Sequence, residues 1–285
     1  MTPLDVSTPE QLSTLLEGRS DAEVLELCAE AGIEAVVEQI LASMLQRFRP
    51  DRAPPGTPTV QWNIETPMGR RPFALKVEGG KCSIERAVAA APRVTLNTTL
   101  PVFMRVIAGR LNGLQAFSDG ELRVAGDLVL ALEHQLWFDV DLSQAQLTIS
   151  RPSELAKLIT GRSDEEVEAG IAITGVDAAL AQVFRGMVEY YVPRKGPSKR
   201  TVVEFSVRTK QGDRVYQLVV DPKGASFHTG SRDSANVTLM LRTGTFLRIA
   251  AGTLDGLVAL AQGRIKLRGN LFVARNVQGW FDLKA

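Results

Sequence analysis

Residues 108–127 read AGRLNGLQAFSDGELRVAGD, and residues 251–270 read AGTLDGLVALAQGRIKLRGN. Both stretches have glycine at their second, sixth, thirteenth and nineteenth positions. The offset between them is 251 minus 108, or 143 residues, and it aligns nearly the whole chain without a gap, from residues 18–21 with 161–164 to residues 137–139 with 280–282. The chain is therefore a tandem repeat of one unit.

Glycines carry much of this repeat. Seven of the ten glycines in residues 1–142 meet a glycine at the same offset, whereas a chain with 24 glycines in 285 residues predicts about one by chance. Glycine recurs where the backbone excludes a side chain or needs a positive φ, so shared glycines indicate a shared fold. We predict two homologous domains, residues 1–142 and 143–285, because a period this long is not that of a solenoid.

Apolar spacing predicts the elements of each half. Apolar residues recur every three or four positions over 33–48 and again over 176–191, which predicts one helix in each half, ended by a proline soon afterwards. Alternating apolar residues then predict strands near 60–64, 73–77, 94–96 and 122–124, with the first three repeated near 203–207, 216–220 and 237–239. Helical patterns follow from about residues 102 and 245. The fold class is α+β.

The overall composition is that of an ordinary globular protein. The net charge is +1, with 45% hydrophobic and 23% charged residues. No stretch reaches the roughly 18 to 20 apolar residues of a membrane span, and the N-terminus lacks a basic, then apolar signal pattern. We expect a soluble, cytoplasmic protein. Two cysteines and two histidines provide neither a disulfide framework nor dense metal-ligand spacing, so we expect no metal.

The two stretches quoted above, together with the strands before them, resemble the sterol carrier protein type 2 family. The resemblance covers roughly residues 33–139 and 176–282. It implies, in each domain, a small mixed β-sheet covered by helices around an apolar tunnel that takes up lipids and other hydrophobic molecules. The helices expected before Ile33 and Val176 are additions to the family pattern. The second half also has Asn270 for Asp127 and Leu260 for Phe117.

The helices after residues 102 and 245 have more apolar surface than one sheet face needs, so their apolar residues are candidates for a cavity lining. Apolar stripes usually pack into a filled core, which is the alternative from the residues alone. The resemblance favours a ligand tunnel. The candidate ligand-binding residues are Phe103, Val106, Ile107, Leu111, Leu114, Phe117, Leu132, Leu136 and Trp137 in the first half, and Phe246, Ile249, Leu254, Leu257, Leu260 and Trp280 in the second.

Catalytic signatures are absent from the sequence. We find no Gly-x-Ser-x-Gly elbow, P-loop or Gly-x-Gly-x-x-Gly motif, so no catalytic residue and no cofactor is expected. His134 aligns with Val277, and His228 with Glu85, so neither histidine is kept in both halves. We expect surface or capping histidines. Polar residues present twice, such as Arg105 with Arg248 and Gln135 with Gln278, are expected to bond helix ends or lie on solvated faces.

Three functions stay open at this point. The first is a carrier or sequestering protein that binds an apolar small molecule in one tunnel per domain, driven by apolar burial. The second is a biosynthetic-pathway enzyme that uses the same tunnel as a reaction chamber. The third is an interaction scaffold with filled cores. The sequence does not fix the oligomeric state.

Charge separates the two halves. Residues 1–142 hold 13 basic and 19 acidic side chains, net −6, and residues 143–285 hold 20 basic and 13 acidic, net +7. In the second half the four residues Arg194, Lys195, Lys199 and Arg200 crowd one loop, whose image in the first half is Asp51, Arg52, Gly56 and Thr57. We predict that this loop contacts an anionic membrane surface transiently, with docking of the acidic first domain and a merely solvated loop as alternatives. Nucleic acid is not an expected partner, because no aromatic residues interleave with the basic ones.

Overall fold

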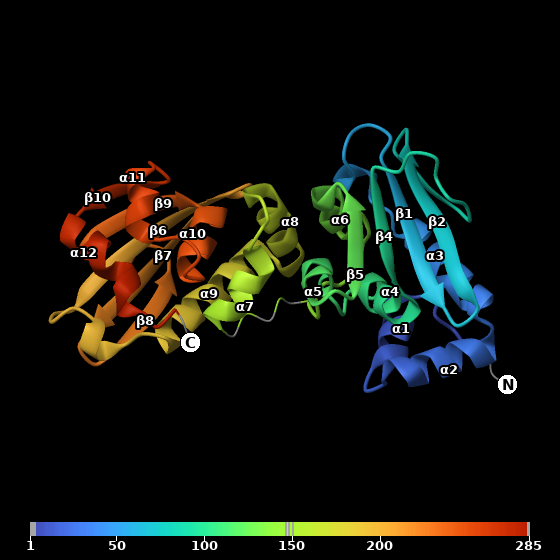
Figure 1. Cartoon of the computed structure of the whole chain (residues 1–285), viewed down its shortest axis with the longest axis horizontal. Helices are drawn as coiled ribbons and strands as arrows, with labels where there is room; N and C mark the ends of the chain where they lie inside the picture. The colour runs from blue at the N-terminus through green and yellow to red at the C-terminus, as the bar shows by residue number, and fades with distance from the viewer. Residues whose placement is uncertain (1–3, 146, 148, 150, 284–285) are drawn as a thin grey trace. The chain divides into compact units, whose positions relative to one another are not determined.

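The structure, a computed structural model, describes residues 4–145, 147, 149 and 151–283. Its chain divides into two compact units, Met1–Leu147 with Ala172–Thr174, and Thr148–Ile171 with Gly175–Ala285. Figure 1 shows one sheet and its own set of helices in each unit. The domain limits 1–142 and 143–285 drawn from the repeat stay predictions.

The first unit begins with helices, continues with strands and ends with short helices around a last strand. Its short 3-10 helices are η1 (Pro50–Arg52) and η2 (His134–Trp137). The remaining elements are α1 (Pro9–Leu16), α2 (Asp21–Ala31), α3 (Ile33–Gln46), β1 (Thr59–Thr66), β2 (Gly69–Glu78), β3 (Lys81–Glu85), β4 (Val94–Thr99), α4 (Leu100–Ile107), α5 (Gly113–Asp119), β5 (Leu122–Gly126) and α6 (Leu128–Glu133).

The second unit repeats this order. Its 3-10 helices are η3 (Pro193–Lys195) and η4 (Val277–Trp280). The remaining elements are α7 (Pro152–Ile159), α8 (Asp164–Thr174), α9 (Val176–Glu189), β6 (Thr201–Thr209), β7 (Gly212–Asp221), β8 (Gly224–Thr229), β9 (Val237–Arg242), α10 (Thr243–Ala250), α11 (Gly256–Ala261), β10 (Ile265–Gly269) and α12 (Leu271–Asn276).

Both sheets are mixed and have the same strand order. The first runs β3-β2-β1-β4-β5 and the second β8-β7-β6-β9-β10. In each sheet the central pair, β1 with β4 or β6 with β9, is parallel, and the other pairs are antiparallel. The predicted α+β fold, with one small mixed sheet and helices in each half, is confirmed.

One pair of repeated glycines shows why the backbone is shared. Gly126 ends β5 with a φ of +102°, and its image Gly269 ends β10 with a φ of +98°. A Cβ atom would lie 2.5 Å from the Arg93 carbonyl oxygen at the first position and 2.6 Å from the Asn236 carbonyl oxygen at the second. Any side chain there would therefore both clash and strain the backbone.

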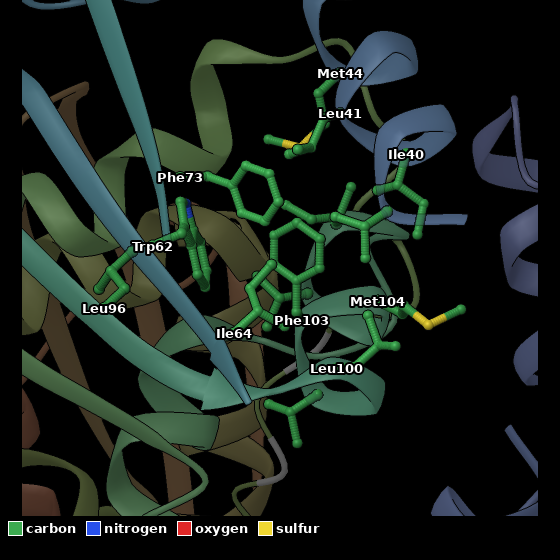
Figure 2. Packing of buried hydrophobic residues seen from close by; sticks show 14 of the residues in the cluster. Ile40, Leu41, Met44, Trp62, Ile64, Phe73, Leu96, Leu100, Phe103 and Met104 are labelled. Carbon is green, nitrogen blue, oxygen red and sulfur yellow. The ribbon is translucent and has the colours of Figure 1, made fainter. Parts of the chain in front are cut away.

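The core of the first unit lies where α3 and α4 cover the sheet. Figure 2 shows side chains of α3 facing those of β1, β2 and β4, with α4 closing the cluster. All the labelled side chains are buried: Ile40, Leu41, Met44, Trp62, Ile64, Phe73, Leu96, Leu100, Phe103 and Met104. The predicted apolar stripe of residues 33–48 is thus the sheet-facing side of α3.

The helices were compared with the length and hydropathy that a membrane-spanning helix needs. In the described part of the chain no single helix is both long and apolar enough to cross a bilayer, and the α8–α9 pair that reaches this length and composition is bent by 99°.

Candidate functional site

The second unit contains an apolar cavity between the inner face of its sheet and its later helices. The cavity holds about 630 Å³ of space free of protein atoms, open solvent at its mouth included. Among the described residues its lining has one polar side chain, Gln278. The lining residues are Met187, Phe205, Leu239, Leu241, Phe246, Ile249, Ala250, Gly256, Leu257, Leu260, Ile265, Leu267, Ala274, Val277, Gln278, Phe281 and Leu283.

Gln278 uses its amide on the backbone between α10 and α11. Its Oε1 accepts the N–H of Gly256 at 2.8 Å, and its Nε2 donates to the carbonyl oxygens of Leu254 at 2.9 Å and Ile249 at 3.2 Å. The one polar lining side chain is therefore bonded to the protein itself. A ligand in this cavity would meet an almost entirely apolar wall, which suits a hydrocarbon and provides little directional selectivity.

The same glutamine recurs in the first unit. Gln135 accepts the N–H of Gly113 at 3.2 Å and donates to the carbonyl oxygen of Val106 at 3.0 Å. A Cβ on Gly113 would lie 2.9 Å from Oε1 of Gln135, so a larger residue there would displace the Gln135 amide. This confirms the expectation that the repeated glutamines bond helix ends.

The corresponding space in the first unit is largely filled. A pocket of about 280 Å³ remains, with open solvent included, lined by Met44, Val106, Ile107, His134, Gln135, Phe138, Val140 and Leu142. Trp62 stands where the second unit has Phe205, and its ring lies 5.1 Å from the Phe103 ring and 5.3 Å from the His134 ring, between centroids. Larger side chains at matched positions thus replace empty volume with packed atoms.

His134 is the C-cap residue of α6 and is buried, so the structure agrees with the expectation of a capping histidine and not with that of a surface one. Its Nδ1 donates to the carbonyl oxygen of Ala131, and within the described chain its Nε2 has no hydrogen-bond partner. Burial lowers the pKa of this imidazole from 6.5 to about 4. The ring is therefore neutral near pH 7. His228 differs, because its Nε2 lies 3.0 Å from Oε1 of Gln217 on the neighbouring strand.

The structure divides the predicted ligand residues of the second half. Phe246, Ile249, Leu257 and Leu260 line the cavity. Leu254 and Trp280 lie outside its lining, and Trp280 is buried.

The predicted residues of the first half are placed differently. Val106 and Ile107 line the small pocket. The others pack in or beside the core: Phe103, Leu114, Leu132 and Trp137 are buried, and Leu111, Phe117 and Leu136 are partly buried. A ligand-binding role for this set stays a prediction.

Sequence reasoning missed the strand side of the cavity. Phe205 on β6 and Leu239, Leu241 and Ile265 on β9 and β10 form much of the wall. The alternation of Val237, Leu239 and Leu241 was the available sequence signal, because alternate side chains of a strand lie on the same face of its sheet.

A second, polar cleft lies elsewhere in the second unit. It holds about 1160 Å³ with open solvent included and is lined by Asp164, Ser206, Arg208, Asp213, Met240, Leu241, Arg242, Thr245, Gly263, Arg264 and Lys266. Arg208 lies 3.0 Å from Asp213, and Arg264 lies 3.7 Å from Asp164. Two of its four cations are therefore neutralised by carboxylates of the cleft.

The predicted basic loop is exposed and begins with η3. Arg200 lies 2.6 Å from a carboxylate oxygen of Asp233. Among the described residues, Arg194, Lys195 and Lys199 have no carboxylate within ion-pair distance. Three of the four cations are thus available to an anionic partner.

Both cysteines are free thiols, Cys28 buried and Cys82 partly buried, and burial raises the pKa of each to about 11. They are therefore protonated and weakly nucleophilic near pH 7. In the part of the chain that the structure describes, no three His, Cys, Asp or Glu side chains gather as metal ligands.

Comparison with solved structures finds several similar chains. A palmitated SCP2L2 from Aedes aegypti is 21% identical, with 36% of this chain and 91% of that chain covered and a TM-score of 0.31. The crystal structure of SCP2-L2 from Aedes aegypti is 24% identical, with 37% and 98% covered and a TM-score of 0.30. A UbiJ-SCP2 ubiquinone synthesis protein is 14% identical, with 39% and 96% covered and a TM-score of 0.30. A comparison with curated proteins gives no match.

A family model provides the assignment. The model of the SCP-2 sterol transfer family matches residues 38–139 and 196–282, one segment in each unit. Each segment contains a whole five-stranded sheet and the helices that follow β4 or β9. The chain therefore belongs to the SCP-2 sterol transfer family.

Proposed function

We propose that the protein binds and carries an apolar small molecule, such as a lipid, a sterol-like or an acyl compound, in the cavity of the second unit. The observation that carries this proposal is the apolar cavity of about 630 Å³ whose polar lining residue is already hydrogen-bonded to the backbone. Family membership supports the same ligand class.

The driving force would be the removal of apolar surface from water, worth about 25 cal/mol per Å². Such binding discriminates ligands by size and shape more than by polar groups. The first unit has a smaller pocket in the corresponding place, beside Val106 and Ile107. We expect that site to remain empty in the parent protein, because the buried Trp62 and His134 are larger than Phe205 and Val277, which line the cavity at the matched positions of the second unit.

We further propose that the carrier works in the cytoplasm and meets anionic membranes transiently through Arg194, Lys195, Lys199 and Arg200. Two free cysteines fit a reducing compartment. Three exposed cations without a carboxylate partner fit an anionic surface, at about 1 kcal/mol per basic residue.

The test is native mass spectrometry of the full chain, followed by titration of the delipidated protein with a fluorescent fatty acyl probe. We expect co-purified apolar mass and one probe per chain. Ala250→Ile, which copies the residue of the first unit into the cavity, should weaken probe binding at least tenfold. Val106→Ile adds volume at the filled pocket and is the matched control. An Ala250→Ile variant that folds and binds like the parent would refute the assigned cavity. Turnover of the extracted ligand would instead identify a reaction chamber.

A further inference from the structure

The second unit exposes four large apolar side chains beside its cavity. Two lie on α11 and two on α12. Their exposed fractions are 42% for Leu257, 45% for Val258, 57% for Leu271 and 77% for Phe272. Both helices contribute to the cavity lining, α11 with Leu257 and Leu260 and α12 with Ala274, and we name the four exposed residues the rim. Soluble proteins rarely leave such large side chains grouped in water without a use.

The strand between the two rim helices is basic. Figure 1 shows α11, β10 and α12 together at one edge of the second unit. From α11 through η4, residues 256–280 include Arg264, Lys266, Arg268 and Arg275 and no acidic residue. Arg264 lies 3.7 Å from Asp164, whereas among the described residues the other three have no carboxylate within ion-pair distance. The nearest acidic residue along the chain, Asp255, caps α11 by accepting the N–H groups of Leu257 and Val258.

The first unit lacks this combination. Its matching residues 113–137 include one basic residue, Arg123, and four acidic ones, Asp119, Glu121, Asp127 and Glu133. Val258 is matched by Gln115, and Phe272 by the smaller Val129. The segment therefore changes from net −3 in the first unit to net +4 in the second. Exposed apolar residues and positive charge occur together in the unit that has the larger cavity.

We propose that the rim is the docking surface of the second unit for a bilayer that contains anionic lipids. The rim side chains would enter the boundary between headgroups and acyl chains, and the cations of β10 and α12 would contact the headgroup phosphates and carboxylates. A second copy of the chain fits less well, because a two-fold axis would bring the same cations against each other. The inference rests on the proposed function, since it lets an apolar ligand pass between bilayer and cavity without crossing water.

Vesicle cosedimentation of the full chain tests the inference. Phosphatidylcholine vesicles with 30% phosphatidylserine should bind the protein, pure phosphatidylcholine vesicles much less, and 0.5 M salt should weaken binding because it screens exposed charges. The double variant Leu271→Ser with Phe272→Ser should bind at least tenfold more weakly, and so should Lys266→Glu with Arg268→Glu. Met68→Ser with Val88→Ser removes two exposed apolar side chains from the first unit and should change nothing.

A second measurement reports insertion directly. Phe272→Cys, made in a Cys82→Ser background and labelled with a polarity-sensitive fluorophore, should shift to shorter wavelength on anionic vesicles. The remaining Cys28 is fully buried and should not react with the label. Val88→Cys, labelled in the same background, should show no shift.

The outcomes separate this inference from the proposed function. Neither Leu271 nor Phe272 lines the cavity, so their serine variants should keep parental affinity for a soluble acyl probe. Ala250→Ile should bind the probe more weakly and keep vesicle binding. If Ala250→Ile kept parental probe affinity, that result would refute the assigned cavity and leave the docking surface standing. Unchanged vesicle binding by the Leu271, Phe272 double variant overturns the docking surface. A loss of vesicle binding that occurs only in the Arg194→Glu, Lys195→Glu variant also overturns it. A parent dimer that Phe272→Ser converts to a monomer, with vesicle binding intact, overturns it as well.

Discussion

The guanidinium of Arg248 lies 3.0 Å from the carboxylate of Asp164, which is 84 residues earlier in the chain. The same guanidinium donates to the carbonyl oxygens of Ile159 at 3.2 Å and Arg162 at 2.7 Å. In the first unit Arg105 pairs with Asp21. Each arginine therefore ties the helix after the sheet's parallel strand to the helices that precede the family segment, and this confirms the expected use of repeated arginines at helix ends.

Replacing Arg248 should destabilise the second unit. Arg248→Ala removes the nearer of the two arginines beside the partly buried Asp164 carboxylate and the side-chain donor to two helix-end carbonyls, at a cost of about 2 kcal/mol. Arg208→Ala removes an exposed partner of Asp213 and should cost much less, because solvent screens an exposed ion pair. Denaturant unfolding of both variants checks the difference, and equal costs would contradict the structural role of Arg248.

The filled first unit should be convertible to an open one. Trp62→Phe with His134→Val gives the first unit the residues that border the cavity in the second. We expect the double variant to bind a second acyl probe per chain. The new void should lower the free energy of unfolding by about 2 kcal/mol, and the probe should restore part of it. Native mass spectrometry counts the bound probes, and a stoichiometry that stays at one per chain would contradict this account.

An arginine in place of the matched leucines Leu257 and Leu114 should abolish ligand binding in the second unit and unfold the first unit. Leu257 is 42% exposed and borders the cavity, so Leu257→Arg should fold and exclude an apolar ligand. Leu114 is 1% exposed, so Leu114→Arg buries an unpaired charge and should unfold the first unit. Circular dichroism with probe titration distinguishes loss of binding from loss of fold. Unfolding of both variants alike would show that the two positions are equivalent.

His134 should make stability fall in acid. The unfolded imidazole has a pKa near 6.5, while burial holds the folded one at about 4. Between pH 6.5 and about pH 4 the imidazole is protonated in the unfolded state and neutral in the folded state. The free energy of unfolding therefore falls by about 1.4 kcal/mol for each pH unit in this range. The His134→Val variant should lose this component between pH 6.5 and 4. Parallel pH profiles for parent and variant would contradict the buried neutral ring.

The repeat and the apolar spacing predicted most of the fold, because regular spacing reports which side of an element is buried. Residues 33–48 and the strands near 60, 73, 94 and 122 lie where expected. The edge strands β3 and β8 were not predicted, since each has a single large apolar side chain, Ile84 or Phe227, and so shows no clear alternation.

The cavity could not be predicted from its helical stripe. Phe103 and Phe246 occupy the same place in the same stripe and each packs edge-on against a strand ring, Trp62 or Phe205, yet only Phe246 also lines a large cavity. The difference depends on the combined volumes of side chains from strands and helices distant in sequence. Spacing within one helix contains no information about that sum.

The six residues of α12 are all described, and none of them is buried, whereas its image α6 buries Leu130, Ala131 and Leu132. Little apolar contact would be lost if α12 left the sheet, so its local opening should require far less free energy than that of α6. Amide hydrogens of α12 should accordingly exchange with solvent deuterium sooner than those of α6. A ligand can then enter and leave the cavity quickly while the sheet stays folded. The rate of ligand exchange would therefore not depend on the free energy of unfolding of the whole unit.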